Sequence, residues 1–178
     1  GLIRPWSMAF LPNGDMLVTE QPGRLRIVRD DRLLEQPVSG VPEVFYKGQG
    51  GLLDVVLHPD FASNRLLYLS YSKPLEDEES TTAVIRGRYS DGALSDVEDV
   101  FVAQSRGRGH YGSRLAFDQQ GYLFISVGDR QVPPTGDLPA HPAQQLSDHH
   151  GVIVRLHDDG RIPADNPFVQ DAKALPEI

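Results

Sequence analysis

Two residues that could handle a proton together lie at one end of a predicted β-hairpin, His110 and Asp129. His110 stands in a Gly- and Arg-rich stretch before residues 114–117, which alternate as a strand does, and Asp129 follows the apolar run 122–127. A turn at residues 118–121 joins the two runs. Antiparallel neighbours lie about 5 Å apart, so the imidazole and the carboxylate are predicted to meet. A histidine oriented by a carboxylate can act as a general base; the alternative is a solvated loop histidine beside a turn aspartate.

The composition is that of one folded domain without disulfide bonds. The chain has 178 residues, 39% hydrophobic and 24% charged, which is enough for a domain with a sizeable core. Seventeen Lys and Arg against 25 Asp and Glu give a net charge of −8, which disfavours nucleic acid and anionic membranes as partners. The absence of cysteine excludes thiolate metal sites and fits an exported or a cytosolic protein. No apolar run approaches the roughly 20 residues of a membrane span, and no signal-peptide pattern opens the chain.

Short apolar runs separated by Gly and Pro turns recur along the chain and predict an all-β fold. The same pattern of strand, Pro/Asp/Gly turn and strand returns around Phe10, Leu57 and Phe117. Repeats of roughly 40–50 residues built from about four strands are typical of β-propeller blades. A β-sandwich, which also has frequent turns, is the alternative fold.

We predict one partial β-propeller domain over residues 1–178, with about three blades at roughly 1–45, 46–105 and 106–178. Three blades do not close a ring, because propellers typically have four to eight. Residues 163–178 show no pattern of a closing strand. The sequence therefore predicts a piece of a longer propeller, whose open sheet edges could pair with a second copy.

Other polar clusters give weaker signals. Adjacent residues on a strand point to opposite faces, so His149 and His150 are expected to lie in a solvated loop, and no metal site is predicted. His58 is expected to brace its His-Pro-Asp-Phe turn by hydrogen bonds. The acidic run 76–79 is expected to be a solvated loop.

Several motifs, in order along the chain, resemble the soluble quinoprotein sugar dehydrogenases. The matching segments are WSMAFLPNG at residues 6–14, GQGGLL at 48–53, LHPDF at 57–61, GHYGSRL at 109–115, GYLFISVGD at 121–129 and GRIPADNPF at 160–168. The segments from 109 to 129 look like the catalytic-histidine region of that family. Together the motifs cover nearly the whole chain, and the branch that looks most similar is the aldose sugar dehydrogenases.

The resemblance implies a six-bladed propeller that carries pyrroloquinoline quinone at the mouth of its central channel, together with calcium. A base takes the proton from the anomeric hydroxyl of an aldose while the C1 hydride passes to the quinone, which yields a lactone. By position, His110 would be the base, Asp129 its hydrogen-bond partner and Gln49 a contact to the sugar hydroxyls. A neutral amide suits a neutral polyol, because it both donates and accepts hydrogen bonds.

The resemblance also bears on the cofactor and on location. Arg114 and Arg130 are candidates to face the carboxylates of the quinone. The family's main quinone-binding cations and its calcium ligands belong to later blades, so this chain alone is expected to be inactive. Gly109 stands where the glucose-specific branch has an acid that holds the sugar, so tight glucose preference is not expected.

A periplasmic or secreted protein that passes electrons to a separate acceptor is implied by the same resemblance. The alternative from another class is a non-catalytic propeller that binds protein or carbohydrate. The discriminating observation is whether His110, Asp129 and Gln49 face one channel mouth.

Overall fold

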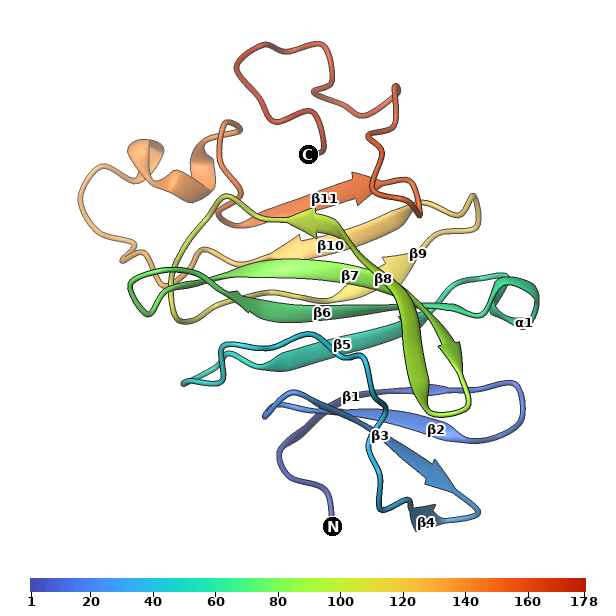
Figure 1. The fold of residues 1–178 in the computed structure, drawn as a ribbon. Helices are drawn as coiled ribbons and strands as arrows, with labels where there is room; N and C mark the ends of the chain where they lie inside the picture. The colour runs from blue at the N-terminus through green and yellow to red at the C-terminus, as the bar shows by residue number, and fades with distance from the viewer.

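The computed structural model describes residues 1–178 as three antiparallel sheets arranged in a row. Figure 1 shows the row in chain order, with the two termini at its opposite ends. The first sheet holds β1 (Pro5–Phe10), β2 (Met16–Glu20), β3 (Arg24–Arg29) and β4 (Arg32–Leu33). The second holds β5 (Leu52–Leu57), β6 (Leu66–Pro74), β7 (Ser80–Ser90) and β8 (Ala93–Val102). The third holds β9 (Leu115–Phe117), β10 (Leu123–Val127) and β11 (Val152–Leu156).

Helical structure is confined to single turns, which are α1 (Phe61–Asn64), η1 (Leu138–Ala140) and η2 (Pro142–Gln144). None of these helices has the length and apolar character that crossing a membrane requires.

Each sheet is a meander in which consecutive strands pair. The first strand of the middle sheet, β5, contacts the first strands of the other two sheets, β1 and β9. Ser7 Oγ in β1 donates to Asp54 in β5, and the backbone N of Leu115 in β9 donates to the same carboxylate. Meanders joined at their first strands form a partial β-propeller. The all-β propeller prediction is confirmed and the sandwich alternative is wrong, while the blade boundaries near residues 45 and 105 stay a prediction.

The middle sheet is covered on both faces, which explains its long apolar runs. Successive side chains of a strand point to opposite faces: Leu67 and Leu69 of β6 pack into a core shared with the first sheet, and Tyr68 packs into a core shared with the third. The outer faces of the row are not covered in this way. Phe10 of β1 and Ile153 of β11 are exposed, so each end of the row presents apolar side chains.

One fully buried carboxylate connects the three sheets. Asp54 accepts hydrogen bonds from Ser7 Oγ at 2.5 Å and from the backbone N of Leu115 at 2.8 Å, and Arg114 Nη1 lies 3.4 Å away. A buried carboxylate is tolerated when its oxygens are hydrogen-bonded. Asp54 therefore fixes the start of β9, five residues after His110, against the two preceding sheets.

Two further features belong to the middle sheet. β8 is one edge strand over residues 93–102, and its exposed middle, residues 95–99, is polar except for Val97. The acidic run 76–79 is a solvated loop as expected, and Glu78 within it forms ion pairs with Lys47 and Arg108.

The structure confirms the expectation for His58 and contradicts the expectation for His149. His58 braces its turn as expected, because its Nδ1 accepts hydrogen bonds from the backbone N of Asp60 and from Asn64. The expectation of a solvated loop at His149 is wrong. His149 is 1% exposed, accepts a hydrogen bond from the backbone N of Gln104 and donates to Glu177.

Burial of His149 predicts an acid-sensitive contribution to stability. Desolvation lowers the pKa of His149 below its ordinary value near 6.5, so the unfolded chain binds a proton that the folded chain resists. This contribution is complete above about pH 6.5 and is lost as the pH falls through the lower folded pKa. We expect the free energy of unfolding, measured in urea, to decrease between roughly pH 7.5 and 5.5.

The decrease should be smaller in His149→Gln, which cannot take up the proton. His157→Gln is the matched control, because it removes a histidine from the surface turn after β11, and it should keep the decrease seen in the parent chain. Equal decreases in the parent and in His149→Gln would contradict the prediction.

Candidate active site

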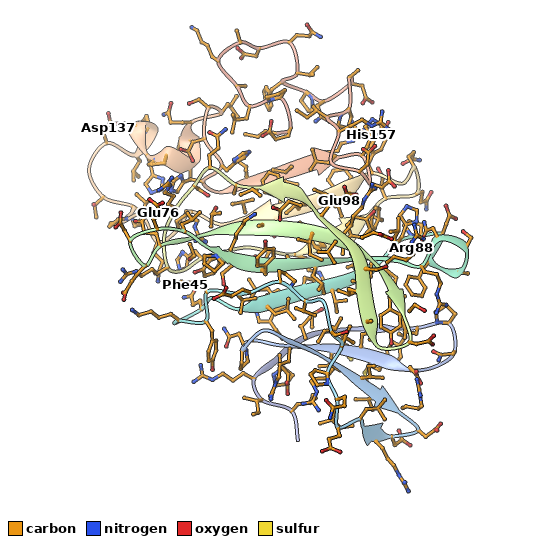
Figure 2. The ribbon with its side chains drawn as sticks, viewed as in Figure 1. Phe45, Glu76, Arg88, Glu98, Asp137 and His157 are labelled. Atoms are coloured by element: carbon orange, nitrogen blue, oxygen red, sulfur yellow. The ribbon has the colours of Figure 1, made fainter.

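The three residues predicted to act together lie in loops at one end of the sheets. Gln49 precedes β5, His110 precedes β9, and Asp129 follows β10. Figure 2 shows that Phe45 and Asp137, which belong to the same loops as Gln49 and Asp129, lie at one side of the molecule, and that Arg88 lies at the opposite side.

His110 and Asp129 are in contact. His110 Nδ1 lies 2.6 Å from Asp129 Oδ1. The hydrogen bond with His110 lowers the pKa of the Asp129 carboxyl, which is therefore ionised at neutral pH. An ionised carboxylate only accepts hydrogen bonds, so Nδ1 carries the proton of the neutral ring and Nε2 carries the free lone pair. The His110 side chain is 50% exposed, which leaves it accessible to a ligand.

The Gln49 side chain contacts the backbone of the same histidine. The backbone N of His110 donates to Gln49 Oε1 at 2.7 Å. This contact occupies the amide oxygen and leaves the Gln49 Nε2 group as a hydrogen-bond donor for a ligand. The structure thus brings together the three residues that the sequence singled out, while their roles in a reaction stay predictions.

Gln49 and His110 line a cavity of about 350 Å³, within the range typical of small-molecule sites. Trp6 from β1 and Tyr111 also line it, so all three sheets contribute to its walls. Asp129 borders a wider hollow of about 700 Å³ that the following loop forms with Leu138 and His141. The His110–Asp129 pair therefore stands between two open spaces.

Close backbone approach explains why glycines surround this pair. A Cβ on Gly128 would lie 1.9 Å from the carbonyl oxygen of His110, and a Cβ on Gly112 would lie 2.6 Å from that of Ser126. The backbone N of Ser113 donates to the same Ser126 oxygen at 2.7 Å. His110 itself has a φ of +44°, a left-handed conformation that costs energy for a residue with a side chain. The loop therefore depends on its contacts for its shape.

The two candidate arginines occupy different environments. Arg114 has a 70% exposed side chain, and the 3.4 Å contact with Asp54 is its one ion pair. Arg130 is 5% exposed, with its guanidinium carbon 4.0 Å from the centre of the Tyr111 ring. Neither arginine contacts the His110 side chain, and a cofactor role for either stays a prediction.

Sequence reasoning missed two residues of the site. Trp6 is the single tryptophan of the chain, is exposed and lines the cavity, which is the kind of signal that could have identified it. Tyr111 is buried, and its hydroxyl lies 2.6 Å from Ser80 Oγ. Its role depends on contacts between distant segments that no local pattern reports.

One residue of the cavity and several arginines outside its lining have the chemistry that suits part of an anionic aromatic cofactor. Trp6 offers an exposed ring, and Arg114 offers guanidinium donors that its single long contact leaves free. Arg106 and Arg108 lie near acidic partners, 3.9 Å from Glu79 and 3.7 Å from Glu78. Within residues 1–178, no three His, Asp or Glu side chains are grouped as metal ligands. The chain thus supplies a few contacts for such a cofactor rather than a complete site.

Residues 2–178 match the family model described as Glucose / Sorbosone dehydrogenase. The chain belongs to this family. It is 46% identical over 182 residues to the aldose sugar dehydrogenase YliI of Escherichia coli strain K12, an alignment that covers 99% of this chain and 47% of the relative.

Solved structures of this family are similar throughout the chain. A crystal structure described as glucose dehydrogenase matches at a TM-score of 0.92 and 44% identity, covering 100% of this chain and 51% of that one. The PQQ-bound form of aldose sugar dehydrogenase from Streptomyces coelicolor matches at a TM-score of 0.82 and 27% identity, covering 99% and 50%. The chain spans about half the length of the relatives it matches.

The Gly128 contact predicts that Gly128→Ala separates His110 from Asp129, because the new methyl group would collide with the His110 carbonyl. Loss of the hydrogen bond removes the main cause of the low pKa of Asp129. We expect the Asp129 pKa, followed by NMR titration of the carboxyl carbon, to rise toward the ordinary value of about 3.9.

Gly121→Asn is the control. This glycine also has a positive φ, which Asn tolerates, and a Cβ there meets nothing within 4 Å. The Asp129 pKa should stay low in this variant. A low Asp129 pKa that persists in Gly128→Ala would contradict the account of the contact.

Proposed function

We propose that this chain supplies the proton-accepting side of an enzyme site that oxidises the anomeric C1 hydroxyl of aldose sugars to lactones, with pyrroloquinoline quinone as hydride acceptor. The observation that carries the proposal is the His110–Asp129 pair, held beside Gln49 at the edge of one cavity. Membership of a sugar dehydrogenase family supports the reaction class. The similarity to a PQQ-bound aldose sugar dehydrogenase supports the cofactor.

His110 receives the proton of the anomeric hydroxyl. Its Nε2 lone pair is free because Nδ1–H is engaged by Asp129, and the ring is open to the cavity. The Asp129 carboxylate stabilises the imidazolium that forms and keeps the ring in the tautomer that can accept. Such general-base assistance typically contributes about 10²- to 10⁴-fold to a rate.

Gln49 and Trp6 orient the sugar. Gln49 Nε2 donates to a sugar oxygen, since its Oε1 is held by the backbone of His110. Trp6 also lines the cavity and presents an exposed ring, against which the C–H face of a sugar ring can pack. Neutral donors and an aromatic face suit a neutral polyol better than a charged substrate.

When bound, pyrroloquinoline quinone supplies the acceptor for the C1 hydride. Arg114 would hold one of its carboxylates. We propose that calcium and the other cofactor contacts come from blades beyond these three, so that the chain acts as part of a longer protein and is inactive alone. The length of the relatives, about twice that of this chain, supports this.

The remaining parts of the proposal concern partners and location. The exposed apolar side chains at both ends of the row, among them Phe10 and Ile153, support self-association of the isolated chain. Light scattering tests this, and a monomer at high concentration contradicts it. A separate electron acceptor and a periplasmic or secreted location belong to the proposal through the family resemblance, and cell fractionation tests the location.

A dye-linked assay of the full-length protein with added quinone and calcium tests the proposed function. We expect aldose oxidation, and a decrease in kcat of about 10²- to 10⁴-fold in His110→Ala. Gln49→Ala should lower kcat/KM, because it removes both a sugar contact and the acceptor for the His110 backbone. His157→Ala, at the opposite end of the sheets, should leave kcat within about twofold.

Two outcomes would contradict the proposal. Normal turnover in His110→Ala would mean that His110 is not the base. Carbohydrate binding without oxidation by the quinone-loaded protein would favour the alternative, a non-catalytic binding propeller.

A further inference from the structure

The buried arginine beside the candidate site has contacts that connect both halves of the His110–Asp129 pair. Arg130 directly follows Asp129 in the chain. Its Nη2 donates to the carbonyl oxygens of Gly107 at 2.7 Å and of Ser80 at 3.3 Å. Its guanidinium lies over the ring of Tyr111, the residue after His110, at 4.0 Å. The Arg130 side chain, next to Asp129 in the chain, therefore contacts the loop that carries His110 both before and after that histidine.

These contacts continue into the second sheet through Ser80. The Tyr111 hydroxyl lies 2.6 Å from Ser80 Oγ, and Ser80 Oγ also donates to the Gly107 carbonyl at 2.8 Å. Ser80 begins β7, so the loop of His110 is fastened to a strand whose position the core fixes. A closed set of contacts therefore lies next to the His110–Asp129 pair and joins Arg130, Tyr111, Ser80 and Gly107.

This arrangement is costly for stability. Arg130 is 5% exposed, its Nε and Nη1 atoms have no hydrogen-bond partner, and no carboxylate forms an ion pair with it. A buried cation without a paired anion carries a large desolvation cost, which the cation–π contact with Tyr111 offsets only in part. Arg130 and Gln131 also adopt left-handed φ values of +56° and +63°. Costs of this kind concentrate where a protein holds functional groups in place.

We propose that Arg130 is a positioning residue for the base: by stacking on Tyr111 and bonding Gly107, it holds His110 at hydrogen-bond distance from Asp129. Its guanidinium acts through the loop and touches neither substrate nor the reacting atoms. The inference rests on the proposed function for its effect on turnover, but its effect on the geometry of the pair does not depend on any reaction.

The test compares Arg130→Met and Arg130→Lys with the parent protein. Methionine keeps the apolar volume but loses the cation and both carbonyl contacts, whereas lysine keeps the charge and one donor for Gly107 but loses the planar stack. Arg88→Met is the matched control, because Arg88 is an exposed arginine at the opposite end of the sheets. Thermal unfolding of each variant reports whether it folds.

The first readout is the tautomer of the His110 ring, measured from imidazole ¹⁵N shifts at a pH where the ring is neutral. It needs neither sugar nor quinone. We expect Nδ1–H in the parent and in Arg88→Met, since Asp129 accepts from Nδ1. In Arg130→Met the population should shift toward Nε2–H, with an intermediate shift in Arg130→Lys. If Arg130→Met does not fold, the shift in Arg130→Lys decides the question.

The second readout is steady-state kinetics of the full-length protein with quinone. We expect kcat to decrease by roughly 10- to 100-fold in Arg130→Met while KM changes little, because a misplaced base affects the reaction rather than sugar binding. An unchanged His110 tautomer in Arg130→Met would overturn the inference. In that case weaker quinone binding would identify Arg130 as a cofactor contact instead. Absence of aldose oxidation in the parent, with the tautomer shift present, would contradict the proposed function alone.

Discussion

The contact of two backbones, one before β9 and one after β10, is the constraint on which the candidate site depends. Gly128 lies so close to the His110 carbonyl that no side chain fits between them, and this approach sets the 2.6 Å separation of His110 from Asp129. A displacement of about 1 Å would break this hydrogen bond, because the two atoms would then lie beyond hydrogen-bond distance. The left-handed backbone at His110 shows that the loop does not adopt this shape on its own. Two contacts hold the loop: Gln49 Oε1 accepts from the backbone N of His110, and the Arg130 guanidinium lies over the Tyr111 ring.

The propeller arrangement makes these contacts possible. Gln49 precedes the first strand of the second sheet, and His110 and Asp129 flank the first two strands of the third. The site therefore exists only where neighbouring sheets are fixed against each other. Asp54 does this at the inner strands, since one buried carboxylate binds groups from β1 and β9. The two cores on either face of the middle sheet supply the stabilising burial. The loops that carry the chemistry can therefore be irregular, because the sheets beneath them are regular.

Local sequence patterns were sufficient to predict the parts of the structure that depend on residues near one another in the chain. The hairpin of β9 and β10 follows from alternation and a glycine turn, and the meeting of His110 with Asp129 follows from the hairpin. Gln49 came from family resemblance, because its bond to His110 joins residues 61 positions apart. The burial of His149 could not be predicted, since its partners Gln104 and Glu177 are distant in sequence. The packing of Arg130 could not be predicted for the same reason. Its position against the Tyr111 ring depends on a left-handed turn that no local sequence pattern indicates, and its role toward a cofactor stays a prediction.

The central claim is that His110 Nε2 faces the anomeric hydroxyl of an aldose, and a crystal structure of the full-length protein with quinone and a bound aldose tests it most directly. The account predicts that His110 Nε2 lies about 2.6–3.2 Å from the anomeric oxygen, with the Nδ1 contact to Asp129 retained and the Gln49 amide nitrogen on a sugar oxygen. An anomeric oxygen held by other residues, with the His110 ring directed away from the sugar, would contradict it.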